Sequence, residues 1–282
     1  MTPSLHKMKR NILFLFILAM LAGCADISPQ SRWQHAAQLA TGAGWRKLRL
    51  PTTHFVLAAY VPLSVSPLAA QTGVLTVYIE GDGFAWITAS QASADPTPRN
   101  PVALELALRH PQGAAAYLAR PCQYVEAADA RNCQPAFWTD RRFSREVVEA
   151  SDQAVSLLKQ RVGAQRLILV GYSGGGAVAA LVAARRSDVV QLVTVAGNLD
   201  HRAWTEEHHV PPLTGSLNPA DEWRALLNVP QRHFVGARDG IVSRAVVEGY
   251  AARFPPAQRP QVISIPGFDH VCCWAEQWGE LF

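Results

Sequence analysis

Short apolar runs alternate with longer segments of mixed polarity along this chain from about residue 54 to its end. Several of the runs are rich in Val, Ile and Leu and contain no regularly spaced polar position. Runs of this kind are typical of strands that are buried on both faces of a mostly parallel sheet. We therefore expect strands at residues 54–62, 74–79, 114–119, 167–170, 189–196, 233–235 and 262–265.

The segments between these runs have the pattern of helices. Ser144 is a suitable N-cap, and the residues that follow it place apolar side chains at helical spacing. We expect further helices over residues 177–186, 242–254 and 273–281. Strand–helix alternation without a repeat or a linker predicts one α/β domain with a doubly wound, mostly parallel sheet over residues 47–282.

The first residues have the features of a targeting segment. Lys7, Lys9 and Arg10 form a basic stretch, and residues 11–22 form an apolar stretch after it. This apolar stretch is shorter than the ~20 residues that a membrane-spanning helix needs, whereas signal peptides have this length. We therefore expect residues 1–23 to be a signal peptide.

The apolar stretch ends at Leu21-Ala22-Gly23-Cys24, which resembles the lipobox of bacterial lipoproteins. The resemblance implies cleavage before Cys24, a lipid on its thiol, and a tether and lead-in over residues 24–46. Because Ala25 stands where a retention-type Asp would be, it also implies an outer-membrane location facing the periplasm. An ordinary signal peptide followed by a coincidental cysteine is the alternative.

The charge of the chain argues against nucleic-acid binding. The formal net charge is +4, and residues 1–23 carry three of these positive charges, which leaves about +1 on the remainder. The remainder also lacks a run of Lys and Arg that would bind a phosphate backbone. With 49% hydrophobic residues, the chain can bury a large core.

Beyond Cys24, the chain contains four cysteines, and an even number in an oxidising compartment predicts disulfides. Of the three pairings, we favour a Cys122–Cys133 bridge, because these residues bracket a short polar loop. Cys272 and Cys273 are adjacent, and they form either a vicinal bridge or two buried thiols. None of the four has the spacing of a zinc site.

The most specific local motif is Gly171-Tyr172-Ser173-Gly174-Gly175, between an apolar run and an Ala-rich segment. A Gly-x-Ser-x-Gly turn holds a serine hydroxyl on a sharp bend where neighbouring side chains would clash. The N–H groups of the following helix point at any oxyanion beside Ser173. The absence of a following Lys argues against a phosphate-binding P-loop, and the glycine spacing is not that of a dinucleotide site.

A serine nucleophile needs a base that is oriented by a carboxylate, and both follow in the chain. Asp239 comes just after the run at 233–235, and His270 comes after the run at 262–265. This order of Ser, Asp and His, each after a separate strand, resembles the α/β-hydrolase family. The resemblance implies an α/β-hydrolase fold, Ser173 as nucleophile, Asp239 as orienting acid and His270 as general base, with no metal or organic cofactor.

Other residues compete for these roles. Asp200, Asp221 and Asp269 are alternative acids, although the first two do not end a strand and Asp269 directly precedes His270. Three further histidines, His201, His208 and His209, lie in one loop, and a metal site there is conceivable. No carboxylate pair or cysteine accompanies them at ligand spacing, which argues against it.

The family takes a second oxyanion donor from the loop after its third strand, where it often has His-Gly. This chain has Glu80-Gly81-Asp82-Gly83 instead. The resemblance implies the backbone N–H groups of Asp82 and Gly174 as donors, with Gly83 as an alternative. Two carboxylates beside a developing negative charge must be neutralised or turned away, and Arg120 and Arg142 are candidate partners.

The family often inserts a cap in the segment that corresponds to residues 198–229. Here that segment is too short for a separate cap domain, and we expect at most a short helix near residues 221–227. Trp86, Trp138 and Trp204 are candidates for the pocket wall, although a buried core position is the commoner role for tryptophan.

The sequence thus predicts an exported serine hydrolase, carboxylesterase-like, that cleaves an ester, or a thioester or amide, of a small-molecule or lipid-like substrate. The alternative is a non-catalytic envelope lipoprotein that uses the hydrolase fold to bind a ligand or partner.

Overall fold

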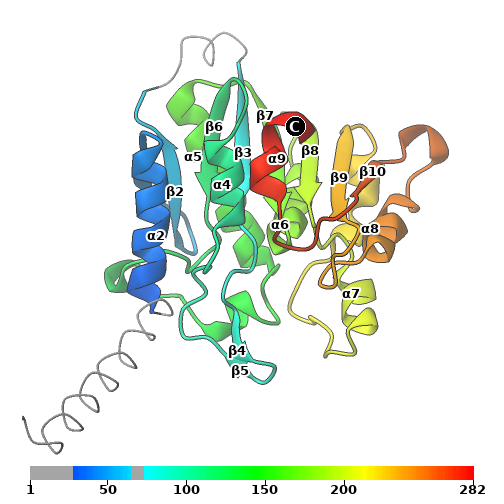
Figure 1. The fold of residues 1–282 in the computed structure, drawn as a ribbon, viewed down its shortest axis with the longest axis horizontal. Helices are drawn as coiled ribbons and strands as arrows, with labels where there is room; N and C mark the ends of the chain where they lie inside the picture. Colours follow the sequence, from blue (N-terminus) through cyan, green and yellow to red (C-terminus); the bar gives the residue numbers. More distant parts are fainter. Residues whose placement is uncertain (1–27, 65–72) are drawn as a thin grey trace, which may run out of the picture.

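A mixed β-sheet forms the centre of the molecule (Figure 1), which a computed structural model describes for residues 28–64 and 73–282. Within these residues the sheet has eight strands in the order β1-β2-β6-β3-β7-β8-β9-β10. The β1–β2 and β2–β6 pairs are antiparallel, and the other pairs are parallel. The strands are β1 (Trp45–Pro51), β2 (Val56–Pro62), β3 (Val74–Ile79), β6 (Ala114–Leu118), β7 (Arg166–Tyr172), β8 (Val189–Val195), β9 (Gln231–Gly236) and β10 (Gln261–Ile265).

Helices cover both faces of this sheet, as expected for a doubly wound domain. Leu75, Val77 and Ile79 of β3 point to one face of the sheet, where α5 and α6 pack on β3 and α8 packs on β9 and β10. Tyr78 of the same strand points to the other face, which α2, α4 and α9 cover. The central strands are therefore buried on both sides, which explains their continuous apolar runs. The helices are α2 (Pro29–Gly42), α4 (Val102–Leu108), α5 (Arg145–Val162), α6 (Gly174–Ala183), α7 (His201–Glu207), α8 (Arg244–Ala251) and α9 (Trp274–Leu281).

The N-terminal part of the fold differs from the expectation of a tether and lead-in over residues 24–46. Helix α2 packs on the sheet with Ala36 and Ala40 fully buried, so the folded unit begins before residue 47. Strand β1 was not expected either. The buried stripe of α2 consists mainly of small alanines, and β1 is an edge strand with exposed charged residues, so neither carries a strong apolar pattern. The proposed signal peptide and Cys24 lie outside the described residues.

No separate cap domain is present in the described part of the chain. Between β8 and β9 the chain forms α7 and two short 3₁₀ turns, Pro219–Asp221 and Trp223–Leu226, which agree with the short helix expected there. A small hairpin of β4 (Trp86–Thr88) and β5 (Gln91–Ala92) follows β3 and was not expected. It projects at the end of the molecule where α7 also lies (Figure 1).

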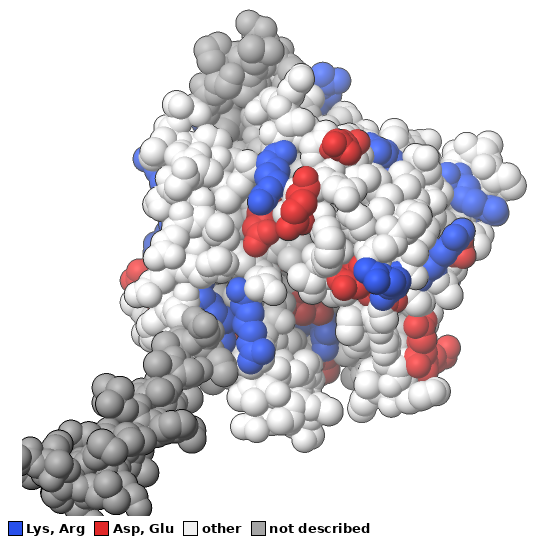
Figure 2. Space-filling model, in the orientation of Figure 1, with Lys and Arg blue, Asp and Glu red and all other residues white. Residues whose placement is uncertain are grey.

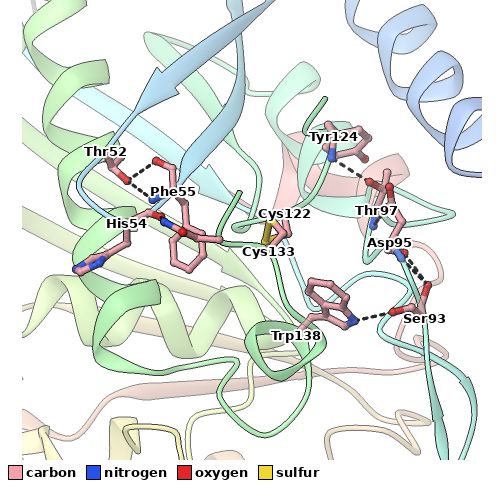
Figure 3. Close-up of a disulfide and its surroundings, with 11 residues drawn as sticks. Thr52, His54, Phe55, Ser93, Asp95, Thr97, Cys122, Tyr124, Cys133 and Trp138 are labelled. Carbon is pink, nitrogen blue, oxygen red and sulfur yellow. Dashed lines mark hydrogen bonds between the residues drawn. A yellow bond between two sulfur atoms is a disulfide. The ribbon is translucent and has the colours of Figure 1, made fainter. Parts of the chain in front are cut away.

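The structure confirms the Cys122–Cys133 disulfide, with the two Cα atoms 5.6 Å apart (Figure 3). Nearby, Trp138 Nε1 donates to the Ser93 carbonyl at 3.1 Å, and the N–H of Tyr124 donates to Thr97 Oγ1 at 2.9 Å. The bridge thus closes a loop beside the segment that returns from the β4–β5 hairpin. Cys272 and Cys273 also form a disulfide, so the vicinal alternative is the one found.

Candidate active site

Ser173 lies on a sharp turn between β7 and α6, as the motif predicts. Its backbone has φ 52°, a left-handed conformation that is strained for a residue with a side chain. A side chain at Gly171 would overlap the backbone of Gly175, and one at Gly175 would overlap the carbonyls of Ile79 and Glu80. The two glycines therefore allow the turn to sit against β3 with its serine projecting.

The fold brings Ser173, His270 and Asp239 together from three separate loops. His270 Nε2 lies 3.0 Å from Ser173 Oγ, and His270 Nδ1 lies 2.9 Å from Asp239 Oδ2. The Asp239 side chain is fully buried, whereas the imidazole of His270 is 15% exposed. A hydroxyl, an imidazole and a buried carboxylate in this order form a continuous hydrogen-bonded relay.

Surrounding groups hold the two partners of Ser173 in place. Asp239 Oδ1 accepts hydrogen bonds from the N–H groups of Ile241 at 2.8 Å and Val242 at 2.9 Å. The carbonyl of His270 accepts from the Tyr172 hydroxyl at 3.0 Å and from Trp274 Nε1 at 3.1 Å. Because both ends of the pair are fixed, the imidazole keeps its orientation toward the serine.

The competing acids have other partners. Asp200 caps α7 and accepts from Asn218 Nδ2 at 2.8 Å and Arg253 Nη2 at 2.9 Å. Asp221 forms an exposed pair with Arg202 at 2.7 Å. Asp269 accepts from the N–H groups of its own loop, Val271 at 2.9 Å and Cys272 at 2.7 Å, and these bonds lower its pKa. Only Asp239 lies at hydrogen-bonding distance from His270 among the described carboxylates.

The histidine cluster does not form a metal site. His208 Nε2 lies 2.8 Å from the carbonyl of Ile241, and His201 is buried beside Phe143. In residues 28–64 and 73–282, no group of three or more His, Cys, Asp or Glu side chains is arranged to hold a metal ion.

The loop after β3 lies directly against the Ser173 turn. The carboxylate of Asp82 occupies the space that a side chain at Gly174 would fill. Within the described residues, neither the N–H of Asp82 nor that of Gly174 donates a hydrogen bond to the protein. Both therefore remain candidate donors for an oxyanion, and the N–H of Gly83, the alternative, likewise donates to no described residue.

Two arginines neutralise the Asp82 carboxylate, as the sequence suggested. Arg120 Nη1 donates to Asp82 Oδ1 at 3.1 Å, and Arg142 Nη1 donates to Oδ2 at 2.8 Å. Both guanidinium groups are almost fully buried. Burial opposes the charged form of Asp82, but the attraction of Arg142 and Arg120 prevails and holds its pKa below the usual value. The three side chains together carry one net positive charge beneath the cleft.

Glu80 behaves differently, because its carboxyl group is buried without a cationic partner. Its Oε1 accepts from the N–H groups of Gly81 at 2.9 Å and Ala103 at 3.4 Å, while no described residue hydrogen-bonds its Oε2. Burial raises the pKa of Glu80 from 4.5 to about 7, although these backbone bonds oppose the shift. At neutral pH this carboxyl group is thus substantially protonated, which limits the negative charge beside Ser173.

Glu80 gives the protein a pH-dependent stability. The folded chain keeps the Glu80 proton longer than the unfolded chain, so the contribution of Glu80 to stability declines as the pH rises from about 4.5 to about 7. The loss amounts to about 3 kcal/mol. Burial lowers the pKa values of His110 and His233, and their contributions change in the opposite direction.

Glu80→Gln removes the Glu80 contribution, so the free energy of unfolding at pH 8 relative to pH 5 is expected to be higher in the variant than in the natural protein. Urea unfolding at pH 5 and pH 8 measures the free energy of unfolding of the natural protein and the variant. Exposed Glu206→Gln is the control and should keep the pH dependence of the natural protein. An unchanged pH dependence in Glu80→Gln contradicts the assignment.

The relay opens into a cleft of about 440 Å³. Two of the expected tryptophans, Trp86 and Trp204, line it, whereas Trp138 is buried in the core. Several other lining residues could not be predicted from the sequence, because they lie in loops without a motif. These residues are Phe84, Arg99, Ile241 and Val271.

Solved structures of similar fold are numerous, although no protein-family model and no curated protein matches this sequence. Est1E from Butyrivibrio proteoclasticus has a TM-score of 0.56 at 14% identity and covers 83% of this chain and 95% of its own. A lidless α/β serine hydrolase from Xanthomonas campestris has a TM-score of 0.53 at 13% identity, with coverages of 84% and 92%.

A third similar structure is a membrane phospholipase A that is described as a bacterial virulence factor. It has a TM-score of 0.52 at 18% identity and covers 97% of this chain and 95% of its own. The chain therefore has the α/β-hydrolase fold, as the sequence predicted. Because a fold of this kind hosts many chemistries, the function has to be argued from the site itself.

Proposed function

We propose that this protein is an exported serine hydrolase, carboxylesterase-like, with Ser173 as nucleophile, His270 as general base and Asp239 as orienting acid. The observation that carries the proposal is the relay from Ser173 Oγ through His270 to the fully buried Asp239. The strained turn, the buried carboxylate and the cleft occur at the same point. Folding alone does not require this coincidence, whereas acyl transfer uses all three features.

The reaction proceeds in two halves. His270 Nε2 takes the proton of Ser173 as Oγ attacks the carbonyl carbon of the ester, and the N–H groups of Asp82 and Gly174 stabilise the oxyanion. His270 then gives the proton to the departing alcohol, which leaves an acyl group on Ser173. In the second half, His270 takes a proton from water as the water oxygen attacks the acyl carbon. The bond to Ser173 Oγ then breaks, His270 returns the proton to Oγ, and the carboxylic acid is released.

An ester of a small-molecule or lipid-like compound is the substrate class that we favour. A cleft of about 440 Å³ accommodates a short acyl chain or part of a longer one. Several proteins of similar structure are named as esterases, and one as a phospholipase, which supports an ester bond over an amide.

We place the protein in the bacterial envelope, held by a lipid on Cys24 and facing the periplasm. The lipobox resemblance at Leu21–Cys24 and the Cys122–Cys133 disulfide both support export. Within the part of the chain that the structure describes, no helix has the length and apolar character to cross a bilayer.

Cys24→Ser is expected to abolish lipid labelling and release the protein from membranes. If the variant remains in the membrane fraction, the proposed lipid anchor on Cys24 is wrong.

Covalent labelling tests the nucleophile. A fluorophosphonate that carries a fluorescent tag is expected to label the protein once, on the peptide that contains Ser173, and Ser173→Ala is expected to prevent labelling. Exposed Ser187→Ala, whose side chain is remote from the cleft, serves as the matched control and should label fully. Absence of labelling in the natural protein favours the alternative, a ligand-binding lipoprotein without catalysis.

A further inference from the structure

Large apolar side chains are exposed around the mouth of the cleft. Trp86 is 40%, Ile241 49% and Val271 48% exposed, and all three line the cleft. Ile87, which follows Trp86 in β4, is 51% exposed. We call these four residues the apolar rim. The other large apolar residues exposed in the described chain lie elsewhere: Leu63 follows β2, Leu157 is in α5 and Val210 follows α7.

The hairpin that carries Trp86 and Ile87 has no charge. No acidic or basic residue occurs between Gly83 and Ala94. The projection at the lower end of the molecule, where β4 and β5 lie, is correspondingly uncharged (Figure 2). An exposed, uncharged hairpin with a tryptophan and an isoleucine has the composition of a segment that enters the interface of a bilayer.

The N-terminal end of α2 is tied to the same segment of chain. Arg32 Nη2 donates to the carbonyl of Asp95 at 3.1 Å, and Trp33 Nε1 donates to Thr97 Oγ1 at 3.1 Å. Asp95 and Thr97 belong to the strand-like return from the hairpin. Figure 1 accordingly shows the start of α2 and the hairpin at the same end of the molecule.

The length of chain before α2 restricts how far a lipid on Cys24 can be from this end. Three residues lie between Cys24 and Ser28, the first described residue, so Ser28 is four residues along the chain from Cys24. Even a fully extended chain spans only about 14 Å over four residues. A bilayer that holds the acyl chains of Cys24 therefore lies within about 14 Å of the N-cap of α2, on the side of the molecule where the apolar rim opens.

We propose that the apolar rim docks on the surface of a phospholipid bilayer, and that the substrate is an ester drawn from that bilayer. This inference rests on the proposed function, because it assigns the substrate class of the same cleft. Insertion of Trp86 and Ile87 replaces contacts with water by contacts with lipid and brings the cleft mouth onto the membrane. An ester in the lipid layer then reaches Ser173 without crossing water, while a soluble ester enters from solution.

The position of the rim is tested with the mature, full-length protein reconstituted in phosphatidylcholine vesicles. The Ser173→Ala protein is used, so that the lipid is not consumed. Vesicles with bromine on the lipid acyl chains are expected to quench part of the tryptophan fluorescence, and Trp86→Phe is expected to remove most of the quenched part. Equal quenching with and without Trp86 overturns the docking proposal, because the rim then does not enter the bilayer.

The substrate class is tested by comparing a soluble ester, p-nitrophenyl butyrate, with a long-chain p-nitrophenyl ester dissolved in the same vesicles. Ile87→Glu is expected to lower hydrolysis of the vesicle ester about tenfold and to change hydrolysis of the soluble ester less than twofold. Leu63→Glu changes another exposed apolar residue, 64% exposed against 51% for Ile87, which lies just after β2; it is the matched control and is expected to change neither rate. Equal rates on vesicles for both variants overturn the proposal.

Two further outcomes are distinguishable. If Ile87→Glu dissociates a dimer in sedimentation experiments and leaves the vesicle rate unchanged, the rim is an interface between copies of this chain and the proposal is wrong. If the natural protein hydrolyses neither ester and Ser173 is not labelled, the proposed function fails, whereas the quenching experiment still decides whether the rim docks.

Discussion

Ser173→Ala is expected to lower ester turnover by about four to six orders of magnitude, the range seen when a triad loses its nucleophile. The loss is large because no other described hydroxyl shares the relay with His270 and Asp239. His270→Ala is expected to be about as damaging, since the hydroxyl of Ser173 then keeps its proton. Steady-state hydrolysis of p-nitrophenyl butyrate by the purified variants measures both effects.

The acid is expected to matter somewhat less than the nucleophile. Asp239→Asn changes the tautomer that His270 adopts without removing the attacking group, and a loss of about 10⁴ in turnover is the comparable case. Asp221→Asn and Asp269→Asn are matched controls, because both carboxylates have partners outside the relay. Full activity of Asp239→Asn together with loss in Asp269→Asn would refute the acid assignment. Full activity of Ser173→Ala would refute the mechanism.

Asp82→Asn is expected to destabilise the folded protein by about 3–5 kcal/mol, the usual cost of breaking a buried ion pair on one side. The substitution leaves the buried guanidinium groups of Arg120 and Arg142 facing each other without a counter-charge. Urea unfolding at neutral pH measures the free energy of unfolding. The exposed pair of Asp221 and Arg202 supplies the control, since Asp221→Asn should cost less than about 1 kcal/mol.

Activity distinguishes the role of Asp82 from a purely structural one. Its carboxylate packs against Gly174, so loss of the arginine contacts displaces the backbone that carries the two oxyanion donors. We therefore expect kcat of Asp82→Asn on p-nitrophenyl butyrate to fall more than KM rises, at a temperature where the variant is folded. If the free energy of unfolding of Asp82→Asn is within about 1 kcal/mol of the natural value, the carboxylate of Asp82 does not stabilise the two buried arginines.

The sequence alone predicted the parts of the protein that depend on local pattern. Strands buried on both faces leave continuous apolar runs, so β3, β7 and β8 were found close to their observed bounds. The turn at Ser173 was predicted because its glycines are required by steric overlap with neighbouring backbone. Asp239 and His270 each follow a separate strand, and from these positions the sequence predicted that they would lie together at Ser173.

Local pattern failed where burial depends on partners distant in the chain. Helix α2 buries small alanines and β1 is a half-exposed edge strand, so their place in the core follows from the sheet that they complete. The hairpin at Trp86 and the lining of the cleft by Arg99, Ile241 and Val271 carried no motif.

Only the tertiary structure decided the electrostatics of the site. The sequence proposed that Arg120 and Arg142 neutralise acidic residues, but not that both would contact Asp82 while Glu80 formed no ion pair with any described residue. The partner of a charged side chain and the extent of its burial depend on which loops lie next to each other. These loops follow different strands of the sheet. The sequence therefore determined which groups are available for the chemistry, whereas the packing of the loops after β3, β6, β7, β9 and β10 determined their protonation, their orientation and the apolar rim around them.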